Sequence, residues 1–213
     1  MRVMRDVAEA LGIFISVLLM GSAAAWPARA VLGLPAWAAG LLTQLVFLGA
    51  SLAIMRFLKR GWGEFGFKLS TSGLIHVSLL SIAIAVSLIC ITSALPEGGQ
   101  GPSELVENPL ALAISLLLVA PICEEVFFRG LLQGYLALKG YDRLSIVLPA
   151  VLFSAVHAIP FSSAGPALLS AVLAGALALG LIAGYFRAAK GSIAHAVLAH
   201  FWFNLPGLIA MML

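Results

Sequence analysis

The sequence contains little charge. Only 10% of its 213 residues are Asp, Glu, Lys or Arg, whereas a soluble domain carries about 25%. Nine acidic and twelve basic side chains are too few to hydrate the surface of a soluble fold of this length. The shortage of charge therefore excludes a soluble enzyme, and the apolar composition excludes a disordered chain.

Cysteine is also scarce, since the chain has only Cys90 and Cys123. The two residues lie in apolar surroundings and form neither a CxxC pair nor a zinc-binding spacing. A disulfide scaffold is therefore excluded. We interpret both cysteines as small hydrophobic residues of the core.

Hydrophobic residues make up 62% of the chain, and the mean hydropathy is +1.10. A membrane β-barrel would alternate apolar and polar residues in strands of about ten, but here the apolar runs are long and unbroken. We therefore predict an all-α, polytopic membrane protein in contact with the lipid bilayer.

The uncharged runs predict about seven transmembrane helices, since one crossing needs about 20 mostly apolar residues. The run over 144–186 is too long for one helix, and it divides at the turn-rich segment 159–166. The run over 108–123 is short, but its apolar character continues past three charged residues to Leu138. The predicted helices cover residues 8–26, 36–57, 73–95, 108–138, 144–158, 166–187 and 191–212.

Basic residues predict the orientation of these helices. With the N-terminus in the cytoplasm, ten Lys and Arg residues fall on inside segments, and Arg29 alone falls outside. The acidic loop 96–107 then also lies outside. We predict an N-inside, C-outside topology, and because the basic residues are explained by topology we expect no nucleic-acid partner. The first residues also resemble a signal peptide, but Asp6 and Glu9 argue against its cleavage.

Three charged residues fall inside a predicted span, namely Glu124, Glu125 and Arg129. Each costs at least about 2.5–3.5 kcal/mol at a bilayer centre, so they must face the protein interior or a water-filled cavity. Glu125 and Arg129 are four residues apart and can pair on one helix face. Glu124 points about 100° away, so we interpret it as the unpaired carboxylate and the better candidate for chemistry.

Further polar residues lie at a similar depth. Measured at 1.5 Å per residue from the inside ends of their helices, Glu124 and His157 lie roughly 22 and 21 Å deep, and His200 and Asn204 roughly 15 and 21 Å. Four polar groups from three helices therefore fall within one slab of the membrane. Two other histidines are expected to pack in the fold or lie at an interface, His76 and His195.

This set of residues fits two chemistries. A carboxylate in a low dielectric can act as a general base that activates water, while His and Asn donate hydrogen bonds to an oxyanion. Alternatively, two His and one Glu match the ligands of a catalytic zinc, with the second Glu as base. The sequence alone leaves both open. It has no HExxH motif and no GxGD aspartate.

Three motifs now occur in order on separate hydrophobic helices. Glu124–Arg129 has the form EExxxR, Phe153–His157 the form FxxxH, and His200–Asn204 the form HxxxN. Together they resemble the CPBP family of intramembrane proteases, also called the Abi or CaaX-protease-and-bacteriocin-processing family. The resemblance covers roughly residues 108–210, and it implies a division into N-terminal helices in 1–107 and a catalytic helical core in 108–213.

The resemblance implies a role for each motif residue. Glu124 would be the base that activates water, and Glu125 its partner with Arg129 as structural counter-ion. His157 would assist water activation or bind metal. His200 and Asn204 would stabilise the oxyanion.

Whether a metal takes part stays open. The family is commonly described as metalloproteases, but a metal-free mechanism with a glutamate base is also compatible with the motifs. A zinc ion would be bound by Glu124, His157 and His200, and Phe153 would form part of the cavity wall.

The resemblance therefore implies an intramembrane endopeptidase that hydrolyses membrane-associated, prenylated or bacteriocin-like peptides. We expect it in the plasma membrane of a prokaryote. Two alternatives stay open: a non-catalytic membrane scaffold that regulates a partner protein, and a proton-coupled transporter that uses the buried Glu and His. The absence of an inverted repeat disfavours the transporter.

Overall fold

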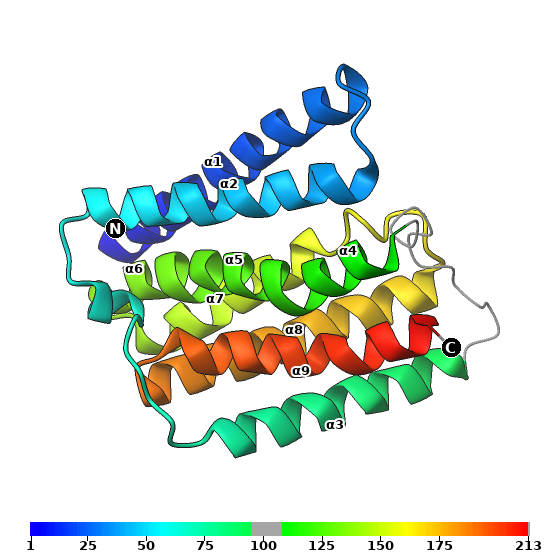
Figure 1. Cartoon of the computed structure of the whole chain (residues 1–213). Helices are drawn as coiled ribbons and strands as arrows, with labels where there is room; N and C mark the ends of the chain where they lie inside the picture. Colours follow the sequence, from blue (N-terminus) through cyan, green and yellow to red (C-terminus); the bar gives the residue numbers. More distant parts are fainter. Residues whose placement is uncertain (95–107, 213) are drawn as a thin grey trace.

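Long helices lie side by side in the computed structural model, which describes residues 1–94 and 108–212 (Figure 1). α1 (Arg2–Ala30) and α2 (Ala36–Phe57) form a hairpin, followed by the short turn η1 (Trp62–Phe65) and by α3 (Leu74–Ser93). The described ranges contain no strand, so the all-α prediction is confirmed. The remaining elements are α4 (Pro109–Ile114), η3 (Ser115–Val119), α5 (Ala120–Glu125), η4 (Val126–Leu132), α6 (Gln133–Leu138), α7 (Asp142–Val156), α8 (Pro166–Lys190) and α9 (Ile193–Met212).

Six helices are long and apolar enough to cross a membrane, with α4 to α6 counted as one helix over Pro109–Leu138. We call this continuous element the motif helix. α7 has 15 residues, which at 1.5 Å per residue is about 22 Å, shorter than the hydrocarbon core of about 30 Å. A seventh crossing and the N-inside orientation therefore stay predictions. The acidic loop 96–107 lies outside the described residues.

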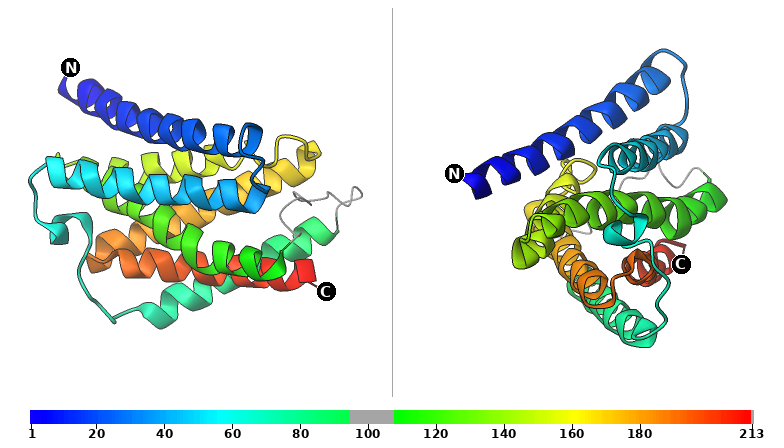
Figure 2. Two further views of the ribbon diagram at one scale, coloured as in Figure 1. Left: turned by 45° about the horizontal axis from the view of Figure 1, so that its top comes forward. Right: turned by 90° about the vertical axis from the view of Figure 1, so that its left-hand side faces the viewer.

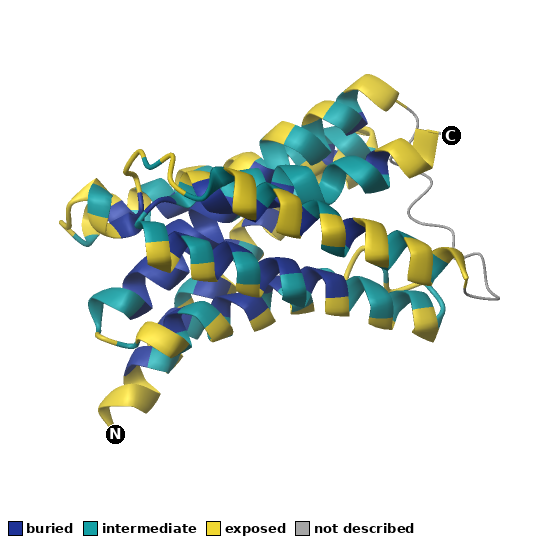
Figure 3. Cartoon of the chain, turned by 90° about the horizontal axis from the view of Figure 1, so that it is seen from below, coloured by how far each residue is buried: buried dark blue, intermediate teal, exposed yellow. Residues whose placement is uncertain are grey.

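The motif helix runs through the interior of the bundle, between the α1–α2 hairpin and the α8–α9 pair (Figure 2). The ring of Phe127 stacks at 6.2 Å on Phe14 of α1 and lies 5.3 Å from Phe47 of α2. Buried residues gather between the helices, and exposed residues line their outer faces (Figure 3). The charged motif therefore lies where lipid is excluded.

The start of α1 is fastened to the end of the motif helix, which is why α1 begins earlier than the predicted residue 8. Asp6 is fully buried and accepts a hydrogen bond from the Tyr141 hydroxyl at 2.8 Å. This hydrogen bond raises the pKa of Tyr141. Lys139 lies 3.4 Å from Asp6, and the Tyr135 hydroxyl donates to Glu9. The charged N-terminal turn thus forms part of the fold.

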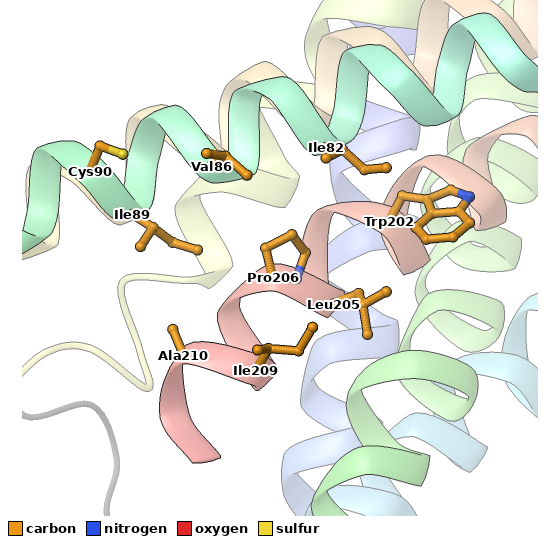
Figure 4. A pocket seen from close by; sticks show the side chains of 9 residues that line it. All are labelled: Ile82, Val86, Ile89, Cys90, Trp202, Leu205, Pro206, Ile209 and Ala210. Atoms are coloured by element: carbon orange, nitrogen blue, oxygen red, sulfur yellow. The ribbon is translucent and has the colours of Figure 1, made fainter. Parts of the chain in front are cut away.

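An apolar groove of about 340 Å³ is lined by residues of α3 and α9 (Figure 4). Cys90 and Trp202 are among its lining residues. Cys90 is exposed whereas Cys123 is buried. The prediction of two core cysteines is therefore right for Cys123 and wrong for Cys90, because apolar surroundings in a membrane helix can face lipid as well as protein.

Candidate active site

The motif helix leaves the α-helical register just before the two glutamates. Its first turn begins at Asn108, whose side chain accepts the N–H of Ala111. Over Ser115–Val119 the turn is π-helical, and the N–H of Ala120 bonds to the carbonyl of Ser115. The next carbonyl in this register, that of Leu116, would meet residue 121, which is a proline without an N–H. Asn204 Nδ2 donates to this freed carbonyl at 2.8 Å.

Glu125 and Arg129 form a fully buried ion pair, as their spacing predicts. Arg129 Nη1 lies 2.9 Å from Glu125 Oε1, and neither side chain is exposed. The guanidinium lies 4.6 Å from the ring centroid of Phe153. Gly180 of α8 gives it room, because a Cβ at that position would lie 3.1 Å from Arg129 Nη2. The pair is held by packing on every side, and its charges offset one another.

His200 links the two glutamates. Its Nδ1 lies 2.9 Å from Glu125 Oε1, and because a carboxylate only accepts hydrogen bonds, Nδ1 carries a proton in this contact. The other ring nitrogen, Nε2, lies 4.0 Å from Glu124 Oε2. Glu125 therefore fixes the ring so that Nε2 faces Glu124, in the way that a carboxylate orients a functional histidine.

Among the described residues Glu124 forms no ion pair with Lys or Arg, as expected, but its carboxylate does have a hydrogen-bond partner. Its Oε1 accepts a hydrogen bond of 2.6 Å from Gln44 Nε2 of α2. Its side chain keeps 15% exposure, whereas that of Glu125 has none. Sequence analysis missed Gln44 because it searched the apolar runs for charge. The available signal was a single neutral amide in the middle of an uncharged span.

His157 and Asn204 lie outside this chain of contacts. His157 Nδ1 bonds at 2.7 Å to the carbonyl of Phe153, on its own helix. Phe153 is fully buried, with its ring 4.7 Å from His157 and 5.5 Å from His200. Among the described residues no hydrogen bond joins His157 or Asn204 to Glu124. Their catalytic roles, and that of Phe153 as a cavity wall, stay predictions.

The two remaining histidines lie elsewhere. His195 is buried and bonds at 2.9 Å to the carbonyl of Ser72, while its ring stacks on Phe186. His76 is exposed on α3. Both positions agree with packing or an interface.

The zinc alternative requires Glu124, His157 and His200 to share one ion. In the part of the chain that the structure describes, no group of three or more His, Cys, Asp or Glu side chains is placed to hold a metal. The Nδ1 atom of His200 donates to Glu125, so only Nε2 could bind an ion. These residues do not fit a metal in this arrangement, so we derive no step through one.

Three comparisons with known proteins bear on this site. Residues 106–206 match the model of a family described as Rce1-like, type II CAAX prenyl endopeptidase. No curated protein and no solved structure matches the chain. The matched region contains all three motifs, whereas Gln44 lies before it.

Proposed function

We propose that the protein is an intramembrane endopeptidase acting on membrane-associated peptides, because residues 106–206 match the model of the type II CAAX prenyl endopeptidase Rce1-like family. Prenylated peptides are the first substrate class to test. Six apolar helices make the protein an integral membrane protein. We keep the plasma membrane of a prokaryote as its proposed location, and residues 108–213 as its proposed catalytic core.

The observation that carries this proposal is the linked set Glu124, His200, Glu125 and Arg129. A carboxylate that keeps some exposure stands 4.0 Å from an imidazole nitrogen, and a buried ion pair fixes that imidazole from behind. A water molecule bound by Glu124 Oε2 would also contact His200 Nε2. This arrangement suits general-base catalysis at a buried site.

The proposed reaction uses this water as the nucleophile. Glu124 takes one proton from the water, and the hydroxide oxygen bonds to the carbonyl carbon of the peptide. His200 accepts a hydrogen bond from the water at Nε2, because its other ring nitrogen carries the proton that is donated to Glu125. The second N–H of the Asn204 amide stabilises the oxyanion, while His157 assists in activating the water. The C–N bond then breaks, and Glu124 returns its proton to the leaving amine.

The test is hydrolysis of a farnesylated peptide ending in a CaaX sequence by the purified protein in proteoliposomes. We expect cleavage by the wild type and a loss of at least 100-fold in kcat for Glu124→Gln, since the amide cannot take the proton. The matched control is Glu64→Gln, the same exchange at an exposed position in η1. Cleavage by Glu124→Gln at the wild-type rate would show that Glu124 is not the base. If the protein were a non-catalytic scaffold, the wild type would cleave no peptide.

A further inference from the structure

A glutamine from outside the family-matched region reaches the proposed catalytic base. Gln44 Nε2 donates to Glu124 Oε1 at 2.6 Å, across 80 residues of sequence. This distance is short for an N–H···O bond, as expected when the acceptor is charged. The contact leaves Glu124 Oε2 turned toward His200. The base is thus held by one oxygen and free to react through the other.

The rest of α2 fixes the position of Gln44. Phe47, Ser51 and Met55 follow it at intervals of three and four residues, so they share its helix face, and all three are buried. Phe47 packs on Phe127 of the motif helix. Met55 packs against Gly130 of the motif helix, so closely that a Cβ on Gly130 would lie 2.9 Å from Met55 Cε. The helix that carries Gln44 is therefore tightly packed against the one that carries Glu124.

The other end of the same amide is unusual. Gln44 Oε1 is buried and has no hydrogen-bond partner among the described residues. A buried amide oxygen without a partner costs about 1–3 kcal/mol. An amide that served only to join two helices could be replaced, together with its partner, by apolar side chains of the same shape at little cost. The presence of this amide next to a carboxylate is explained if its N–H end has a function.

We propose that Gln44 is a positioning residue for catalysis, which holds Glu124 so that Oε2 faces the water and His200. The expected effect of Gln44 on catalysis rests on the proposed function. The contact between Gln44 and Glu124 does not depend on it. It assigns the N-terminal helices a part in the active site, in addition to spanning the membrane.

The kinetic test compares Gln44→Leu and Gln44→Glu with the wild type on the farnesylated CaaX peptide. Gln44→Leu removes both the N–H and the carbonyl of the side-chain amide. Gln44→Glu keeps the shape of the side chain but replaces the N–H donor by a carboxylate oxygen. We expect both to lower kcat about 10- to 100-fold, the value of one hydrogen bond to a charged group, with KM within about twofold. A merely structural role would lower the yield of folded protein and leave kcat per folded molecule unchanged, which would overturn the proposal. The control is Thr43→Val, whose hydroxyl bonds to the carbonyl of Ala39 in α2 and to no other of the described residues.

A second measurement does not depend on activity. We expect thermal unfolding of Gln44→Leu, Glu124→Leu and the double variant in detergent to show coupling, with the double variant shifted less than the sum of the two. Additive shifts would show that the side chains do not interact, and would overturn the inference. If the shifts couple but the wild type cleaves no peptide, the proposed function fails and the assigned contact stands.

Discussion

His200 and Glu125 are joined by a hydrogen bond of 2.9 Å between Nδ1 and Oε1, and Arg129 binds the same oxygen at 2.9 Å. One carboxylate oxygen therefore orients the imidazole and neutralises the guanidinium together. We expect the two functions to separate on mutation, with loss of the ion pair affecting mainly stability and loss of the histidine contact affecting mainly catalysis.

We expect Arg129→Met to lower the free energy of unfolding by about 3–5 kcal/mol, because it leaves the charge of Glu125 buried without its cation. The double variant Glu125→Gln with Arg129→Met should recover part of this loss, since no uncompensated charge is left. Thermal or denaturant unfolding in detergent measures both. Arg56→Met, the same exchange at an exposed position on α2, is the control and should change stability by less than about 1 kcal/mol. Equal losses at the two positions would contradict the buried pair.

Pro121 is expected to have opposite effects on stability and activity. Pro121→Ala restores an N–H that can bond within the helix, so the melting temperature should rise. The same change competes with Asn204 for the carbonyl of Leu116 and alters the π-helical register before Glu124. A shift of about 1 Å at a catalytic group can cost about 100-fold, so kcat should fall at least tenfold.

The control for Pro121 is Pro27→Ala, an exposed proline inside α1. It should stabilise the protein and leave kcat unchanged. If Pro121→Ala raised stability with full activity, the π-helical turn would have no part in placing the glutamates.

The helices and the ion pair were accessible from the sequence because both depend on local geometry. Uncharged runs mark the helices, and a spacing of four places Glu125 and Arg129 on one face. Depth along a helix is also local; it predicted that Glu124 and His200 lie in one slab, and the structure places their side chains 4.0 Å apart.

The contacts between helices were not accessible in this way. Depth says nothing about how each helix is rotated about its axis, and that rotation is set by packing. The rotation of each helix determines which side chains form hydrogen bonds: His200 with Glu125, Asn204 with the carbonyl of Leu116, and Gln44 with Glu124. A neutral amide in an apolar span is a weaker signal than a charge, but its burial has a similar requirement for a partner.

Metal chelation should leave activity intact. The donor atoms of Glu124, His157 and His200 are not placed to share one ion, and the proposed base acts directly on water. We expect kcat of the protein to be unchanged after dialysis against 1,10-phenanthroline, measured on the farnesylated peptide. Loss of activity that added zinc restores, and that magnesium does not, would show that the site rearranges around a metal.

The predicted orientation can be checked with single cysteines at the two ends of α2. In a Cys90→Ser, Cys123→Ser background, Arg60→Cys should react with a membrane-impermeant maleimide only from the cytoplasmic side, and Leu32→Cys only from outside. The reason is the excess of Lys and Arg on the segments assigned inside, ten against one. Both positions are exposed, and α2 has 22 residues, or about 33 Å, enough to separate them by a full membrane. Each position therefore serves as the control for the other, and labelling of Leu32→Cys from the cytoplasm would reverse the topology of the whole chain.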